Sequence, residues 1–301
     1  AGTPIIWQNV GDWDLAQRTA WYAKLFGVAV NNYKTPTLDA MLRIGNLVET
    51  GGAGGLPASI NPLPAGTTDP FPTNPATGQL VSCTNNYHIL FTDGKTNQVT
   101  PVTTPGDQDA TVPNTLSLAA GNPIQQNPPD NVLNSLKPLA VSGTAWPRPF
   151  VQGTAIPNTL ADVAAYYWTR DLRPTTSMPN NVPASASKGT ADLDPTKDVA
   201  WWQHVNFSAI SFGAEGTLDA TQQPATMAAL TSGSLSWPDL TQPYNPIYPK
   251  GAGAGAVAVD DLWHATVMSR GSFVYARSPI EVAYGLANIL AGIQNQRKSR
   301  S

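Results

Sequence analysis

The sequence predicts an α/β protein with a mainly parallel sheet and helices on both of its faces. Short apolar runs typical of buried strands alternate along the chain with segments of helical periodicity. One run, Tyr87 to Phe91, contains no Gly or Pro and is typical of a strand buried on both faces. It ends in Thr92-Asp93-Gly94, which places the Asp93 carboxylate just past the carboxyl end of a core strand. Open α/β sheets form their ligand crevices at that edge.

The first elements are expected to be two helices. Asp12 can cap a helix over residues 13–27. Pro36 suits the first position of the next helix, because its missing N–H would have had no partner there, and Thr35 is then the N-cap. Apolar residues at helical spacing continue this second helix to Val48.

The remaining elements follow in alternation. A strand is expected over residues 86–92, and a helix is expected to begin at Thr159, where Asp162 can complete a capping box. That helix ends near Arg173. Further along the chain we expect a strand at 205–213, a short helix at 260–268, a strand at 272–276 and a well-buried helix from 279 to about 293.

Aperiodic stretches rich in Pro and Gly separate these elements. The chain has 28 Pro and 25 Gly residues, well above average usage. We interpret the stretches as insertions between the elements of one domain that spans residues 1–301. The insertions are expected at about 49–82, 95–157, 173–198 and 214–258.

The composition indicates an exported protein with long loops. Only 12% of the residues are charged, and the net charge of −3 gives no electrostatic support for a nucleic-acid partner. No apolar run approaches the roughly 18 residues that a membrane span needs. No basic segment followed by an apolar core begins the chain, so we expect any signal peptide to have been removed already.

The single cysteine, Cys83, cannot form a disulfide within this chain. We expect a buried, inert thiol. A partner outside the chain is the alternative.

Five motifs stand in order along the chain. They are Lys34-Thr35-Pro36-Thr37-Leu38; Ser82 to Tyr87 with Thr92-Asp93-Gly94; Leu160 to Ala164 with Tyr166-Tyr167-Trp168 and Asp171 to Pro174; Trp202-Gln203-His204 with Gly213 to Leu218; and Asp260 to Ala265 with Arg270-Gly271. In this order they resemble the PilC/PilY family of type IV pilus proteins. The resemblance covers the family's von Willebrand factor A-like region, and it implies that this α/β fold is von Willebrand factor A-like.

The resemblance also implies a cation site. An A domain holds one cation with oxygen ligands from an Asp-x-Ser-x-Ser loop, a Thr and an Asp after a core strand. By resemblance, Thr35 and Asp93 occupy the second and third loops, and the ion would be a single Mg²⁺ or Ca²⁺. Two features depart from the family: the chain contains no Asp-x-Ser-x-Ser pattern, and Lys34 replaces a Gly. As alternatives, Thr35 serves only as a cap and Asp93 only as a turn residue.

The function that the resemblance implies is non-enzymatic. The chain would be a binding module of a type IV pilus tip or biogenesis protein, active in adhesion or pilus assembly. It would lie at the cell surface, at the pilus tip or associated with the outer membrane. Pilus subunits or minor pilins, or a host or surface ligand, would be its partners. The alternative is a structural scaffold whose metal site is degenerate.

Other candidate residues favour structural roles. Asp107 and Asp109 have Asp-x-Asp spacing but lack the Gly and the distal Glu of an EF-hand loop. His88 and His264 are expected to be structural, and Asp261 can pair with His264 on one helix face. We expect a solvated acidic turn at Asp192, Asp194 and Asp198, and no nucleotide loop at Gly251, Gly253 and Gly255.

An exported hydrolase that uses His204 or His264 is a third functional alternative. The sequence has no Gly-x-Ser-x-Gly elbow and no His-Glu-x-x-His motif to support it.

Overall fold

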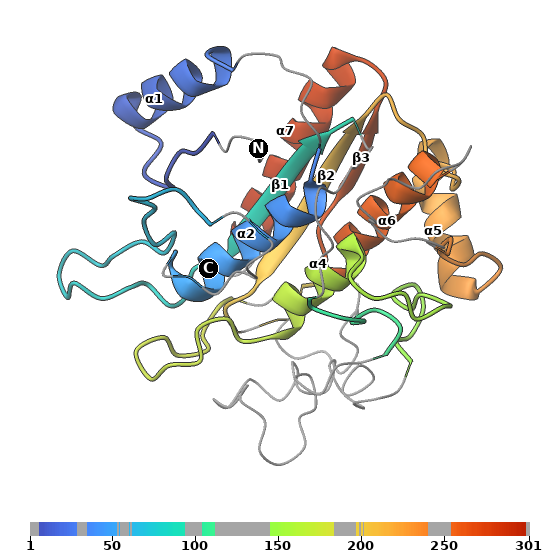
Figure 1. The fold of residues 1–301 in the computed structure, drawn as a ribbon, viewed down its shortest axis with the longest axis horizontal. Helices are drawn as coiled ribbons and strands as arrows, with labels where there is room; N and C mark the ends of the chain where they lie inside the picture. Colours follow the sequence, from blue (N-terminus) through green and yellow to red (C-terminus); the bar gives the residue numbers. More distant parts are fainter. Residues whose placement is uncertain are drawn as a thin grey trace.

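The protein is built around a parallel sheet, as the computed structural model shows (Figure 1). The structure describes residues 6–28, 35–52, 54, 60, 62–93, 104–111, 145–183, 197–198, 200, 202–239 and 254–298. Three strands form the sheet in the order β1 (Asn86–Thr92), β2 (Val205–Phe212) and β3 (Phe273–Ala276). Both pairings are parallel. The α/β class is therefore confirmed, and the sheet agrees with a von Willebrand factor A-like region.

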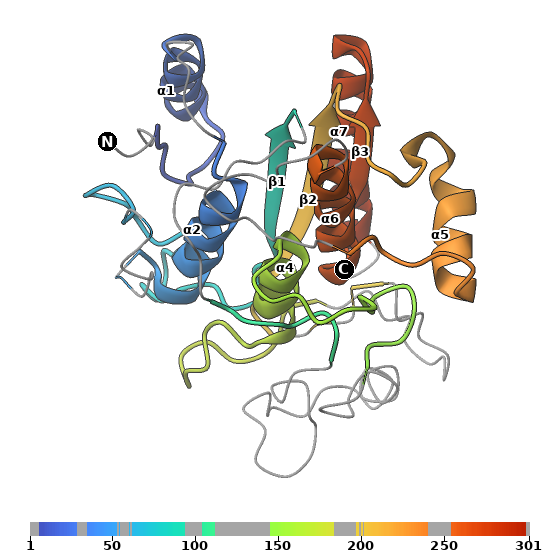
Figure 2. The same cartoon turned by 45° about the vertical axis from the view of Figure 1, so that its right-hand side comes forward.

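Alternate residues of β2 face two different layers. Phe207 and Ala209 pack into the larger core with the helices α4 (Leu160–Thr169) and α6 (Ala254–Met268). Ile210 lies on the other face, where it packs with residues of α7 (Pro279–Lys298). Figure 2 shows the sheet between α7 and the layer of α4 and α6. Helices thus cover both faces of the sheet.

The remaining helices lie around this sandwich. α2 (Thr37–Thr50) packs beside α4, and its buried side chains join the larger core. A short turn of 3₁₀ helix, η3 (Ala220–Gln222), leads into α5 (Gln223–Ser232), which the sequence did not predict. α1 (Leu15–Phe26) has no buried residue, and it stands apart from the sheet at the upper left of Figure 1.

Burial differs from expectation in two elements. The prediction that the first strand is buried on both faces was wrong, because β1 is an outer strand of the three described and most of its residues are only half-buried. The prediction of a well-buried last helix was also wrong. α7 packs one side on the sheet, and Ile280 and Tyr284 on its other sides are 61% and 66% exposed.

Several boundaries also differ. The cap of α1 is Asp14 in place of Asp12, and it accepts the backbone N–H of Gln17 at 2.8 Å. α6 begins at Ala254, six residues before the predicted start. Cys83 is exposed, so the prediction of a buried thiol was wrong. Among the described helices, none combines the length and the apolar character that crossing a membrane requires.

Candidate functional site

The two residues expected to ligate a cation lie at the ends of their predicted elements. Thr35 is exposed and precedes α2, and its carbonyl oxygen accepts the N–H of Thr37 at 2.9 Å. The N-cap of α2 is Pro36, so the prediction that Thr35 caps this helix was wrong by one residue. Asp93 is exposed directly after β1 and accepts the hydroxyl of Thr92 at 3.4 Å. Their joint role as ligands stays a prediction, and Lys34 lies outside the described residues.

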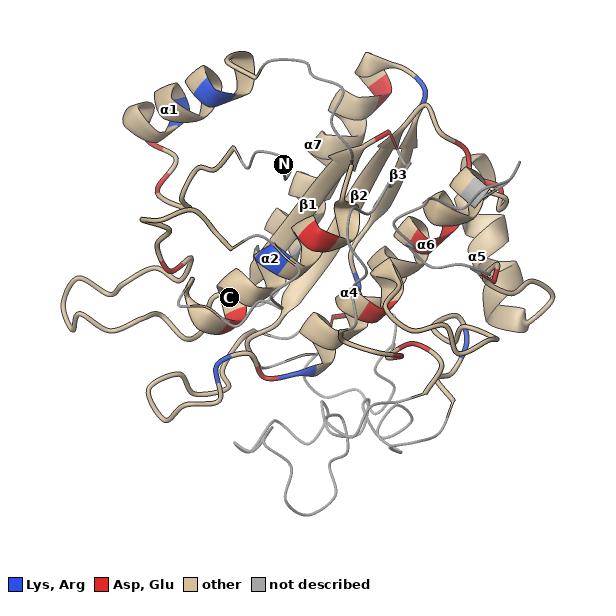
Figure 3. Ribbon diagram, viewed as in Figure 1, with Lys and Arg blue, Asp and Glu red and all other residues tan. Residues whose placement is uncertain are grey.

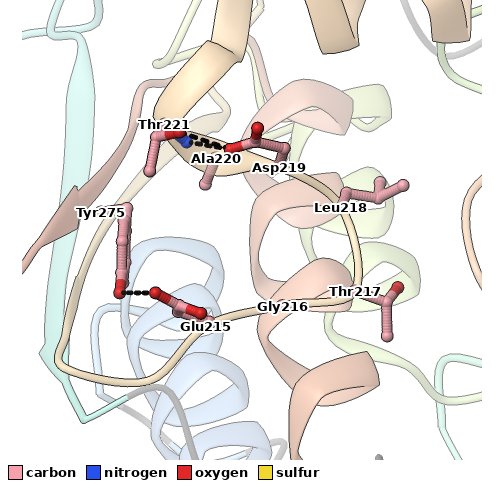
Figure 4. A pocket seen from close by; sticks show the side chains of 8 residues that line it. All are labelled: Glu215, Gly216, Thr217, Leu218, Asp219, Ala220, Thr221 and Tyr275. Carbon is pink, nitrogen blue, oxygen red and sulfur yellow. Dashed lines mark hydrogen bonds between the residues drawn. The ribbon is translucent and has the colours of Figure 1, made fainter.

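A pocket of about 330 Å³ opens at the carboxyl end of the sheet, in the loop after β2 (Figure 4). On one side the Tyr275 hydroxyl donates to Glu215 Oε1 at 2.8 Å. On the other side, Asp219 accepts the N–H of Thr221 at 2.9 Å and its hydroxyl at 2.6 Å. The two carboxylates make the lining acidic, so the pocket suits a small polar or cationic group. It lies where parallel sheets place their ligands.

Asp260 of α6 holds the loop that lines this pocket. Its carboxylate accepts the N–H of Thr217 at 2.8 Å and that of Leu218 at 3.1 Å. Burial raises the pKa of Asp260, and the hydrogen bonds from Thr217 and Leu218 oppose that rise. A Cβ on Gly216 would stand 2.0 Å from Asp260 Oδ1, so only glycine allows the loop to lie this close. This contact explains the glycine of the motif Gly213 to Leu218.

A second candidate site surrounds the first turn of α4, where four carboxylates converge. Thr159 and Asp162 form the predicted capping box, with Thr159 N–H donating to Asp162 Oδ2 at 2.8 Å. Asp261 of α6 accepts the N–H groups of Leu160 and Ala161 at 2.8 and 3.2 Å. Asp261, the predicted partner of His264, thus caps a different helix. The partial positive charge at the N-terminus of α4 stabilises the ionised carboxylates of Asp162 and Asp261.

The 104–111 segment brings two more carboxylates to this turn. Asp107 and Asp109 lie with Asp162 so that one oxygen of each is within 4.8 Å of the others. Asp109 and Asp162 are fully buried, whereas Asp107 is half-buried. Figure 3 shows acidic segments at the start of α4 and along α6. We call Asp107, Asp109 and Asp162 the acidic cluster.

Burial and the neighbouring carboxylates disfavour the ionised forms of Asp109 and Asp162. Burial raises the pKa of Asp109 well above its usual range, and the neighbouring carboxylates of Asp162, Asp261 and Asp107 raise it further. Burial also raises the pKa of Asp162 to about 7, against the hydrogen bonds from Thr159 and Gln108. Like charges in a low dielectric disfavour ionisation unless a proton or a cation compensates them.

Two buried polar side chains face Asp109. His264 Nδ1 lies 3.6 Å from Asp109 Oδ2, and its other ring nitrogen, Nε2, lies 2.6 Å from the carbonyl oxygen of Phe150. The amide of Gln152 also points at Asp109, with one terminal atom 3.2 and 3.1 Å from the two carboxylate oxygens. Both side chains are almost completely buried.

The other two histidines sit in structural surroundings. His204 is fully buried, with Nδ1 2.6 Å from the carbonyl oxygen of Trp202 and Nε2 3.2 Å from Asp198 Oδ2. Asp198 also accepts Trp168 Nε1–H at 3.1 Å. His88 stands edge-on to the ring of Phe207 at 5.1 Å. These contacts suit packing and hydrogen bonding in the core. The prediction of a solvated acidic turn was wrong at Asp198, which is buried, and Asp192 and Asp194 lie outside the described residues.

Sequence reasoning named all members of the acidic cluster but did not join them. Asp107 and Asp109 were visible only as an Asp-x-Asp spacing, and Asp162 already had a sufficient local role as a cap. The pocket after β2 carries no local signal beyond its glycines. The one sequence signal for the cluster is the number of Asp residues, without nearby Lys or Arg, in the segments that meet at the N-terminus of this helix.

Comparison with known proteins finds relatives over most of the chain. It is 30% identical over 239 residues to the type IV pilus biogenesis factor PilY1 of Pseudomonas aeruginosa strain UCBPP-PA14, a match that covers 74% of this chain and 17% of that protein. It is 29% identical over 287 residues to PilY1 of strain PAO1, covering 92% of this chain and 20% of the relative. The chain thus spans about a fifth of the length of these curated relatives. No family model matches it, and no solved structure does.

Proposed function

The chain belongs to the PilC/PilY family, and we propose from this premise that it is a non-enzymatic binding module of a type IV pilus biogenesis protein. The observation that carries the proposal is the similarity to PilY1 along 92% of this chain. The module would act in adhesion or in pilus assembly at the cell surface, at the pilus tip or associated with the outer membrane. Residues 1–301 would form one domain with insertions.

The geometry supports binding at the carboxyl edge of the sheet. Asp93 after β1 and the acidic pocket after β2 lie at the ends of adjacent parallel strands. Loops at this edge are positioned by a rigid sheet and are free to vary in sequence, which suits recognition of a partner. Pilus subunits or minor pilins, or a host or surface ligand, would dock there. Thr35 and Asp93 would make the contact depend on Mg²⁺ or Ca²⁺.

A scaffold role is the second candidate. The chain lacks the Asp-x-Ser-x-Ser pattern of a complete cation site, so the domain would serve assembly through its shape alone. Thr35 and Asp93 would then have only local roles at the ends of their elements.

Deletion and complementation in the organism that encodes the chain test the proposal. We expect deletion of the gene to lower the number of surface pili or the adhesion of cells, and the wild-type gene to restore them. Unchanged piliation and unchanged adhesion in the deletion strain would contradict a role in the pilus system. The double variant Thr35→Ala/Asp93→Ala then separates the candidates. Loss of adhesion with normal piliation supports cation-dependent binding, whereas full complementation favours the scaffold.

A further inference from the structure

We propose that the acidic cluster of Asp107, Asp109 and Asp162, together with His264 Nδ1, binds one divalent cation that ties the 104–111 segment to the first turn of α4. This site is separate from Thr35 and Asp93, and it does not depend on the proposed function. Its role would be structural, because Asp109, Asp162 and His264 are all almost completely buried.

The spacing of the oxygen atoms fits a single ion. Oxygen ligands of Ca²⁺ lie 2.3–2.6 Å from the ion, so two ligands on opposite sides are about 5 Å apart. One carboxylate oxygen from each residue of the cluster lies within 4.8 Å of the other two. The oxygens therefore can surround one cation without rearrangement of the backbone.

The side-chain donors to Asp109 are neutral. Asp162 accepts backbone N–H groups from Gln108 and Thr159, and Asp107 accepts that of Ala110 at 3.0 Å. Asp109 is fully buried; the hydroxyl of Thr159 lies 3.5 Å from its Oδ2, and the Gln152 amide nitrogen, when it is turned toward Asp109, donates to both carboxylate oxygens at 3.2 and 3.1 Å. Because these donors carry no positive charge and two more carboxylates lie beside Asp109, its ionised form needs a cation nearby, or a proton must neutralise it.

His264 supplies an independent indication of a ligand. A carbonyl oxygen only accepts hydrogen bonds, so the contact of Nε2 with Phe150 O at 2.6 Å places the proton of the neutral ring on Nε2. Nδ1 then carries a lone pair, and that lone pair is directed at Asp109 Oδ2, 3.6 Å away. Two acceptors face each other across a buried gap. A metal ion between them would accept electron pairs from both, and the Nε2–H contact would fix the ring for ligation.

Gln152 can donate a hydrogen bond to Asp109 when the site is empty, or act as a further ligand when the site holds an ion. Its terminal amide atom nearest Asp109 lies 3.1 Å from Oδ2. With the amide nitrogen in that place, the side chain donates to Asp109 in the empty site. With the oxygen there, it joins the carboxylates around the ion. The two orientations occupy the same space. With the oxygen toward Asp109 the amide nitrogen faces only donors, so the first orientation is the favoured one in the empty site.

The donor chemistry defines the class of ion. Carboxylate and amide oxygens suit Ca²⁺, Mg²⁺ and Mn²⁺. An imidazole nitrogen is a better ligand for a transition-metal ion than for Ca²⁺ or Mg²⁺. Mn²⁺ accepts both kinds of donor, and its free-ion EPR signal is lost on binding, so it is the appropriate probe.

Direct binding of Mn²⁺ to the folded chain tests the proposal. We expect EPR titration to show one Mn²⁺ per chain that depends on Asp109, with competition by excess Ca²⁺ or Mg²⁺ and a rise of several degrees in the thermal midpoint relative to EDTA. Asp109→Asn keeps the shape of the side chain but removes its charge, and it should weaken binding at least tenfold. His264→Gln should weaken Mn²⁺ more than Ca²⁺, which a merely structural histidine would not do.

Two control variants separate this site from others. Asp12→Asn removes an exposed carboxylate outside every site described above and should bind Mn²⁺ normally. Asp93→Asn removes a ligand of the predicted A-domain site and should retain the Mn²⁺ that depends on Asp109. Asp107→Asn alters a half-buried ligand and provides a milder test if Asp109→Asn fails to fold. The proposal is overturned if the folded wild-type chain binds no ion, or if Asp93→Asn and not Asp109→Asn removes binding. If added cations do not change the thermal midpoint of the wild-type chain and Asp109→Asn raises that midpoint, a proton occupies the gap between Asp109 and His264.

Discussion

The α-carbon of Gly271 lies against the backbone carbonyl of Phe207, so that a Cβ at this position would stand 1.8 Å from the carbonyl oxygen. Gly271 lies three residues after the end of α6, and Arg270 before it has a left-handed φ of 59°. The turn then pairs the N–H of Ser272 with Ser208 Oγ at 3.0 Å. This close approach sets β3 beside β2, which explains why a glycine ends the motif Arg270-Gly271.

We therefore predict that Gly271→Ala destabilises the protein. The methyl group would overlap a backbone atom of a central strand, which cannot rotate away, and overpacking of this kind costs about 1–3 kcal/mol or more. Gly292→Ala is the matched control. Gly292 lies in α7, and a Cβ there meets nothing within 4 Å, so alanine should stabilise the helix by about 0.5–1 kcal/mol. Urea unfolding of both variants checks the prediction, and equal free energies of unfolding would contradict it.

A second prediction concerns the ion pair that ties the 62–93 segment to the end of α4. Arg173 Nη1 lies 2.9 Å from Asp69 Oδ2 and Nη2 lies 3.0 Å from Oδ1, a bidentate arrangement with side chains 12% and 28% exposed. Arg173 also donates from Nε to the carbonyl of Val48 and stacks over the ring of Phe71 at 4.7 Å. Lysine cannot make the two parallel hydrogen bonds to Asp69, so we expect Arg173→Lys to lower the free energy of unfolding by about 1–2 kcal/mol.

A double-mutant cycle measures the pair itself. For Arg173→Ala and Asp69→Ala we expect a coupling of about 1 kcal/mol, since partial exposure screens the charges. The exposed pair of Arg277 and Glu281, 3.6 Å apart and one helical turn from each other, is the control. Its coupling should be about 0.3–0.5 kcal/mol. A coupling for Arg173 and Asp69 no larger than that of the control would show that the bidentate geometry contributes nothing.

The parts of the fold that the sequence predicted well carry their signals locally. Thr159 and Asp162 are three residues apart, and their capping box needs only the first turn of α4. The paired strands β1 and β2 stand out as apolar runs. An apolar run does not report how many neighbours a strand has, so the half-burial of β1 at the edge of the described sheet was missed. The same limit applies to α7, whose apolar residues exceed what one sheet face can cover.

The acidic cluster could not be predicted because its members are brought together by tertiary packing. Asp162 lies 53 positions after Asp109, and His264 lies on another helix that packs against α4. Each residue also has a sufficient local explanation when it is considered alone. Only the convergence of α4, α6 and the 104–111 segment shows that their charges share one buried site.

The exposure of Cys83 gives a third prediction. The thiol is exposed in the turn before β1, so it should react stoichiometrically with a thiol reagent in the absence of denaturant. Labelling with Ellman's reagent before and after unfolding in urea measures this. A thiol that reacts only after unfolding would contradict the structure. Cys83→Ser should leave the free energy of unfolding nearly unchanged, because an exposed side chain contributes little packing.

The last prediction concerns pH. Desolvation lowers the pKa of His88 from 6.5 to about 4, so the native state holds the imidazole neutral beside Phe207. Between these two values the unfolded chain binds a proton that the native state does not, and stability rises with pH wherever the unfolded state binds more protons. The contribution of His88 is therefore fully present above pH 6.5 and is lost as pH falls toward 4. His88 is only half-buried, and contact with water weakens the effect of desolvation. We therefore expect its contribution to the free energy of unfolding to fall by about 1–2 kcal/mol between pH 7.5 and 4.5.

His88→Phe isolates this effect. It keeps an aromatic ring against Phe207 and removes the titrating group, while the carboxylates that also titrate in acid remain common to both proteins. Urea unfolding at pH 7.5 and 4.5 should show a smaller loss of stability in His88→Phe than in the wild-type chain. If both proteins lose the same free energy over this range, the ring of His88 is hydrated in the native state and its protonation does not oppose folding.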